Sequence, residues 1–123
     1  MRSDDALLLD MLIAARRVER FVEGMTYPEF QDDDMAQSAV IRELQVLGEA
    51  ARLVSKETRD VLNGIDWRTM IGMRNRLVHE YFAIRLDVVW QTTQDDIPPV
   101  IKELTRVVPA DDDGEEANED HST

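Results

Sequence analysis

The sequence contains no cysteine, only two lysines and no long apolar run. The absence of cysteine excludes disulfides and thiolate metal sites, so nothing argues for an oxidising compartment. No apolar run approaches the roughly 20 residues that a membrane-spanning helix needs. Acids flank the three leucines near the start of the chain, which is not typical of a secretory signal. We therefore expect a cytoplasmic protein with no membrane segment.

Positive charge is also scarce, because 26 acids stand against 14 bases and give a net charge of −12. Seven of these acids lie in residues 110–123, a tail that holds no lysine or arginine. Without the tail, 19 acids against 14 bases leave a body charge of −5. An acidic body argues against broad, non-specific binding to nucleic acid, although a local phosphate site stays possible.

The chain has 123 residues, the length of one domain. We expect residues 1–109 to form that domain, and residues 110–123, which are acidic and poor in apolar side chains, to form a disordered tail. Apolar residues recur at helical spacing, and no segment alternates strongly enough to predict a strand. The sequence therefore predicts an all-α bundle of four to five helices.

The first half of the chain predicts two long helices joined by a short connector. Asp4 or Asp5 is expected to cap a helix that runs to about residue 23 and ends at Gly24. Pro28 is expected to open a short helical turn. Acids at 32–34 then begin the second long helix, whose apolar seam has the spacing of lengthwise packing. The seam consists of Val40, Leu44, Leu47, Ala51 and Val54.

A small residue and a short helix lead to the third long helix. Gly48, inside the second helix, would allow another backbone to approach this helix closely. Ordinary tight packing of the core is the more common reason for such a small residue. Residues 56–63 predict a short helix that Gly64 stops. Asp66 is then expected to cap the third helix, which starts at Trp67.

The last part of the domain predicts a helix interrupted by two prolines. It begins near Asp87 and meets Pro98 and Pro99, which lack the backbone N–H of a regular helix. We therefore expect a kink or a new start at this point, with Asp95 or Asp96 capping the second part. The helix is expected to end at Pro109.

The segment 66–82, DWRTMIGMRNRLVHEYF, concentrates the side chains suited to chemistry. A guanidinium, an amide, an imidazole and a phenol lie close together in it. They belong to Arg74, Asn75, His79 and Tyr81. Arg68 and Arg76 in the same segment, and Arg85 just beyond it, are candidates for binding RNA or a phosphate group.

These residues also have an ordinary structural interpretation. A single histidine on a helix is more often structural than catalytic, and arginines on a helix face are usually solvated. The sequence has no glycine-rich phosphate loop, no metal-ligand spacing, and no serine or cysteine nucleophile with a base. We therefore expect no metal and no cofactor.

Helical geometry separates the arginine from the histidine. On a straight helix Arg74 and His79 project about 140° apart, whereas Asn75 and His79 share a face. The two can meet at one phosphate only if the helix unwinds near residues 78–81 or if two copies of it come together. A homodimer is the simpler solution.

A converged set of these groups could cleave RNA without a metal. A histidine can move a proton to or from the 2′-hydroxyl that attacks the neighbouring phosphate. An arginine can stabilise the charge that develops on the phosphorane. DNA lacks the 2′-hydroxyl and should resist this route.

The strings GEAARLVS, WRTMIGMRNRLVHEYF and LDVVW together resemble the HepT-like branch of the HEPN superfamily. The resemblance runs from about Asp5 to Val108 and leaves out only the acidic tail. It implies a helical bundle that dimerises with its two Arg-x4-His motifs at the interface. It also implies a ribonuclease toxin of a prokaryotic toxin–antitoxin pair of the HepT/MntA type. The implied antitoxin is a minimal nucleotidyltransferase that can silence the toxin by transferring AMP onto the motif tyrosine.

The resemblance assigns roles to residues of this chain. Arg74 and His79 become the catalytic pair, Asn75 the polar residue that follows the arginine, and Tyr81 the AMP acceptor. One departure is visible: related sequences often cap the last long helix with an aspartate where this chain has Arg85 or Leu86. Asp87 is then expected to take over as the cap.

A second interpretation belongs to a different class of protein. In a non-catalytic HEPN-type binding module, the same groups would hold a nucleotide or the nucleotidyltransferase partner. The presence of both Arg74 and His79 favours the ribonuclease.

Overall fold

The computed structural model describes residues 3–80 and 84–109 of the chain. All regular elements in these two ranges are helical, which confirms the predicted all-α fold. The elements are α1 (Asp4–Val22), α2 (Tyr27–Gln31), α3 (Asp34–Leu53), α4 (Lys56–Val61), α5 (Trp67–His79), α6 (Leu86–Gln91), the π-helical turn η2 (Thr92–Asp96) and α7 (Ile97–Val107). The predicted acidic tail, residues 110–123, lies outside the described residues.

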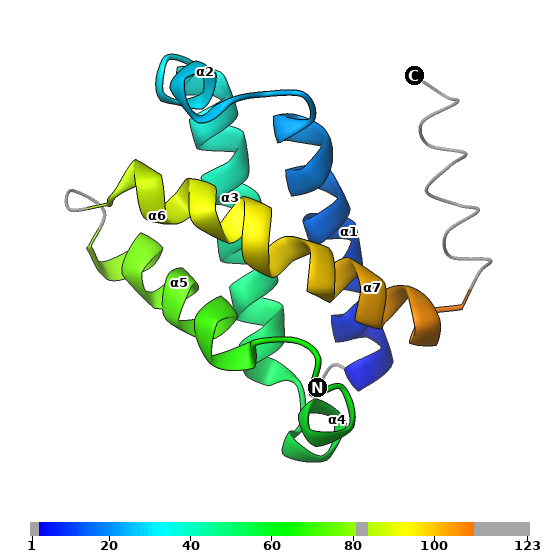
Figure 1. Cartoon of the computed structure of the whole chain (residues 1–123). Helices are drawn as coiled ribbons and strands as arrows, with labels where there is room; N and C mark the ends of the chain where they lie inside the picture. The colour runs from blue at the N-terminus through cyan, green and yellow to red at the C-terminus, as the bar shows by residue number, and fades with distance from the viewer. Residues whose placement is uncertain (1–2, 81–83, 110–123) are drawn as a thin grey trace.

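The two long helices α1 and α3 pack against each other and form the centre of the bundle (Figure 1). Helix α5 packs on α3, and the continuous run from α6 through η2 to α7 crosses in front of both long helices (Figure 1). The short helices α2 and α4 lie at opposite ends of the molecule. Within the described ranges, no helix is long and apolar enough to cross a membrane.

The apolar seam predicted for the second helix lies in the core. All five of its residues are buried: Val40, Leu44, Leu47, Ala51 and Val54. They belong to the same apolar core as buried side chains of α1, which packs against α3; these include Met11, Leu12 and Val18. Burial of this seam fixes how α3 is rotated about its axis, and so which of its residues face α5.

The start of α1 differs from the prediction. Ser3 caps the helix, because its side-chain oxygen accepts a hydrogen bond from the N–H of Ala6 at 3.3 Å. Asp4 and Asp5 are therefore not caps but lie in the first turn. At the other end the prediction is confirmed, since the helix stops at Val22 and Gly24 has a φ of 77°, which favours glycine.

The Asp4 carboxylate joins the start of α1 to the connector between α3 and α4. It accepts hydrogen bonds from the Ser55 N–H at 3.1 Å, from the Ser55 hydroxyl at 2.6 Å and from the Thr58 hydroxyl at 2.6 Å. These bonds, with the Ser55 side chain first, lower the pKa of Asp4. No local pattern predicts this contact, because Asp4 lies more than fifty residues before Ser55 and Thr58 in the chain.

The predicted starts of the middle helices are confirmed. Asp33 caps α3 through the N–H of Ala36 at 2.9 Å, and Asp66 caps α5 through the N–H of Thr69 at 3.1 Å. The turn at Pro28 is also helical. Because Asp66 fixes where α5 begins, it sets the register of the motif segment.

The chain passes the two prolines without a capped restart. Neither Asp95 nor Asp96 makes a side-chain cap at the start of α7, and the backbone of Asp96 is itself helical. The expected cap is therefore wrong. The wider π turn η2 accommodates the missing N–H groups of Pro98 and Pro99, so the helix continues through the interruption.

The expected cap at Asp87 is also wrong. Arg85 occupies the N-cap position of α6 without a side-chain cap, and Asp87 lies in the first turn. Its carboxylate pairs with the Arg85 guanidinium at 2.6 Å and accepts from the Val88 N–H at 3.0 Å. The pair thus neutralises both charges at the start of α6.

We predict that Asp4→Asn lowers the free energy of unfolding by about 1–3 kcal/mol, because hydrogen bonds to a charged carboxylate are lost. The pKa of Asp4 is lower in the folded state, so its stabilisation is present above the unfolded pKa of about 3.9. It disappears as the pH falls through the lower folded value. Urea denaturation at several pH values measures this, with Asp5→Asn as the control that removes an exposed charge from the same turn.

Candidate active site

Four buried side chains anchor α5 to the core. Trp67, Met70, Met73 and Leu77 point inward, and the Trp67 indole N–H donates to the Leu62 carbonyl at 2.9 Å. The spacing of these residues fixes the rotation of α5. The remaining side chains of the motif therefore point toward α3, away from the molecule, or toward α6.

Arg74 points toward α3 and is half-buried. Its guanidinium lies 3.2 Å from the Glu49 carboxylate and donates to the Asn75 side-chain oxygen at 3.0 Å. Glu49 also binds Arg52 at 2.8 Å. The hydrogen bond from Arg52, with smaller effects of the charges on Arg52 and Arg74, lowers the pKa of Glu49. Arg74 is thus held between a carboxylate of α3 and its own neighbour.

Gly48 permits the close approach of α3 to α5 at this point. A Cβ added to Gly48 would lie 2.3 Å from the Arg74 Cβ and 2.7 Å from the Met70 carbonyl oxygen. Contacts this short do not occur between real atoms, so only glycine fits here without a backbone shift. The tight packing expected for Gly48 therefore lies directly against the candidate catalytic arginine.

His79 is the last residue of α5 and is exposed. The helix is regular up to it, and the cap residue Glu80 donates its N–H to the Arg76 carbonyl at 2.8 Å. Among the described residues no hydrogen bond joins Arg74 to His79, in keeping with their separation of about 140° around the axis. Unwinding before His79 therefore does not bring the two together within one chain.

Asn75 is exposed one turn before His79. Its side-chain oxygen is occupied by Arg74, so it orients the arginine rather than the imidazole. Tyr81, the predicted AMP acceptor, lies outside the described residues.

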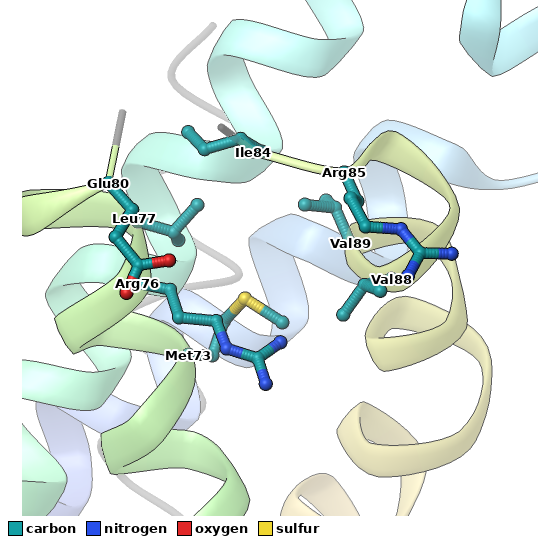
Figure 2. A pocket seen from close by; sticks show the side chains of 8 residues that line it. All are labelled: Met73, Arg76, Leu77, Glu80, Ile84, Arg85, Val88 and Val89. Atoms are coloured by element: carbon teal, nitrogen blue, oxygen red, sulfur yellow. The ribbon is translucent and has the colours of Figure 1, made fainter. Parts of the chain in front are cut away.

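Arg68 and Arg76 are both exposed, and both line a hollow of about 470 Å³ between α5 and the α6–η2 run. A narrower pocket of about 200 Å³ continues from it (Figure 2). Figure 2 shows Arg76 extending from α5 toward α6 beside the apolar side chains of Met73 and Val88. The four arginines therefore do not form one cluster: Arg74 binds Glu49, and Arg85 binds Asp87.

Two parts of this site were not found by sequence reasoning. One is Glu49, whose pairing with Arg74 depends on the packing of α3 against α5. The other is the hollow, whose far wall comes from α6 and η2. Among the described residues no group of three or more histidine, aspartate or glutamate side chains lies close enough to hold a metal ion.

Residues 11–107 match the family described as "Ribonuclease HepT-like". The match includes α5 and the Arg74–His79 motif. The chain belongs to the HepT-like family. This confirms the resemblance drawn from the motif strings.

Named relatives of this HepT-like chain agree with the match. It is 36% identical over 103 residues to "Putative RNase MJ1380" of Methanocaldococcus jannaschii, covering 84% of this chain and 94% of the relative. It is 35% identical over 97 residues to "Probable ribonuclease HepT" of Thermococcus cleftensis, covering 79% and 88%. No solved structure gives a significant match.

We predict that Gly48→Ala lowers the free energy of unfolding by about 1–3 kcal/mol, because the added methyl group forces α3 and α5 apart. Chemical denaturation measures the change. Gly64→Ala is the control, since a Cβ there meets only the flexible end of the Glu103 side chain. Equal stability of the two variants would contradict the close contact at Gly48.

Proposed function

We propose that this protein is the toxin of a toxin–antitoxin pair and a metal-independent endoribonuclease that acts as a homodimer. The observation that carries the proposal is an intact Arg74–His79 motif on α5 in a member of the HepT-like ribonuclease family. Arg74 and His79 are the proposed catalytic residues, and Asn75 orients Arg74. RNA is the proposed substrate.

The proposed reaction needs one proton carrier and one anion binder. His79 is exposed and can reach a 2′-hydroxyl or a leaving oxygen, where it acts as general base or acid. The guanidinium of Arg74 stabilises the additional negative charge on the phosphorane. The 2′-oxygen attacks phosphorus, the bond to the 5′-oxygen breaks, and a cyclic phosphate forms on the upstream fragment.

The charge on α5 supports a phosphate-containing substrate. The helix carries three arginines and no acid, although the whole chain has a net charge of −12. The local positive field can attract RNA while the rest of the surface repels it. Binding is thus directed to the helix that holds the motif.

A second copy of the chain supplies what one α5 cannot. Arg74 points toward α3 and His79 points outward, so a site with both groups on one phosphate requires two helices.

Exposed apolar side chains next to Arg74 also support the dimer. Val78 and Leu53 are 44% and 48% exposed and line a shallow hollow with Arg74. Apolar residues grouped around a functional arginine are typical of a protein–protein contact.

The proposed antitoxin is a minimal nucleotidyltransferase that transfers AMP to Tyr81. Tyr81 is two residues beyond His79 in the sequence. A bulky anion attached there would compete with RNA for the arginines and cover the histidine. The alternative function, a non-catalytic module that binds a nucleotide or the partner enzyme, is favoured by the hollow beside Arg68 and Arg76, which does not include Arg74 or His79.

We predict that His79→Ala lowers the rate of RNA cleavage at least 100-fold, because general acid–base catalysis contributes about 10²–10⁴-fold. Cleavage of labelled RNA in the presence of a chelator measures the rate, and the products are tested for cyclic phosphate ends. Arg20→Ala, which removes an exposed arginine of α1, is the control. Wild-type cleavage by a folded His79→Ala protein would end the assignment.

We predict that a mixture of Arg74→Ala and His79→Ala proteins recovers activity that each lacks alone. Mixed dimers contain one intact combination, with Arg74 from one protomer and His79 from its partner. The two proteins are unfolded together, refolded and assayed. If the mixture is as inactive as its components, the two residues do not combine across the interface.

We predict that Tyr81→Phe stays an active ribonuclease when it is co-expressed with the nucleotidyltransferase, because phenylalanine lacks the hydroxyl that accepts AMP. Mass spectrometry of the co-expressed proteins measures the added AMP. A modified and inactive Tyr81→Phe protein would place the acceptor elsewhere.

A further inference from the structure

The hollow between α5 and the α6–η2 run has the size and composition of a ligand site. We call it the α5–α6 groove and define it by Arg68, Gly72 and Arg76 on one wall and Val88, Thr92 and Asp96 on the other. Its volume of about 470 Å³ lies within the usual range for small-molecule sites. The narrower pocket beside Met73 extends it toward the end of α5 (Figure 2).

Asp96 is the acid of this groove that lacks a partner. Its carboxylate is half-buried and makes no hydrogen bond or ion pair with any described residue. Asp95 accepts from the Gln91 amide, and Asp87 binds Arg85. Burial, together with the charges of Asp66 and Asp95, raises the pKa of Asp96. A half-buried carboxylate without donors is unfavourable, and a ligand with N–H groups would satisfy it.

The opposite wall carries two arginines that also lack an ionic partner. Arg68 and Arg76 form no ion pair with the described residues, and both are exposed. They are two turns apart on α5, or about 12 Å along its axis, so they can bind separate phosphates. A ligand that satisfies the whole groove therefore carries N–H donors for Asp96 and more than one phosphate for the arginines. A single strand of RNA has both.

We propose that the α5–α6 groove binds a guanine nucleotide within an RNA strand. The Asp96 carboxylate accepts hydrogen bonds from the base, and Arg68 and Arg76 bind phosphates of the strand. The choice of RNA as the ligand rests on the proposed ribonuclease function. The groove would make that ribonuclease selective for strands that contain guanine.

Guanine is the base that fits a carboxylate best. Its Watson–Crick edge presents N1–H and the N2 amino group side by side, so the two oxygens of Asp96 can each accept one hydrogen bond. Adenine and cytosine place an acceptor next to their amino group, and uracil places acceptors on both sides of its N–H. An ionised carboxylate has only acceptors, so it disfavours all three.

The position of the groove separates recognition from cleavage. Arg68, at the Asp96 end, is eleven residues before His79, about 16 Å along the helix axis. The recognised guanine is thus not the nucleotide that is cut but one further along the strand. The groove would set the distance from a guanine to the cut site.

The first test titrates the folded wild-type protein with GMP, AMP and IMP, which lacks the N2 amino group, by calorimetry. GMP is expected to bind about tenfold more tightly than AMP, with IMP weaker than GMP, since a bidentate base contact discriminates by about this factor or more. Asp96→Asn is expected to remove the preference. Asp95→Asn is the matched control, because Asp95 does not line the groove and should keep it. Equal binding of GMP and AMP by wild type, or an unchanged preference in a folded Asp96→Asn protein, overturns the proposal.

The second test separates this site from the ribonuclease activity. RNA strands with one guanine, or with inosine in its place, are bound to His79→Ala protein and cleaved by wild type. We expect guanine-dependent binding, with cuts at a fixed distance from the guanine. Cleavage without guanine dependence overturns the groove and leaves the ribonuclease. Guanine binding that requires Asp96 without any cleavage by wild type supports the groove and overturns the ribonuclease.

Discussion

The close contact between α3 and α5 at Gly48 is the constraint on which the candidate site depends. Because this residue has no Cβ, the Met70 carbonyl and the Arg74 side chain can lie directly against α3. The next residue of α3, Glu49, is then close enough to hold the Arg74 guanidinium. The buried seam of α3 and the inward residues of α5 fix the two helices in this relation. The position of Arg74 is therefore determined by how the buried residues of α3 and α5 pack, and not by surface contacts.

The same core packing divides the motif into three directions. Arg74 is turned to α3, Asn75 and His79 point away from the molecule, and Arg76 faces α6. One chain thus presents parts of a site, and in the homodimer that we propose a second copy unites the arginine with the histidine. The side of α5 that faces α6 holds neither catalytic residue. We propose that it binds the RNA strand beyond the cut site.

Local patterns in the sequence were sufficient for most of the fold. The period of the α3 seam, the acids that begin α3, the cap at Asp66 and the break at Gly24 each depend on a few neighbouring residues, and the structure confirms them. Local patterns did not predict which residue caps α1, because three neighbouring polar residues can each cap a helix and Ser3 does so. They also did not predict the π-helical turn before Pro98, because this backbone conformation is rare. The contact of Glu49 with Arg74 and the place of Asp96 in the groove were not predictable, because they depend on how distant helices are rotated against each other. The motif itself was found from its residue types.

In the reaction that we propose, the pairing of Arg74 with Glu49 also affects how RNA enters the site. In the free protein the guanidinium already holds an anionic oxygen, so its side chain is ordered before any substrate arrives. A phosphate that replaces the carboxylate exchanges one anion for another and does not carry the entropy cost of fixing a flexible arginine. Glu49 keeps Arg52 as a partner during the exchange. The carboxylate thus acts as a placeholder for the phosphate.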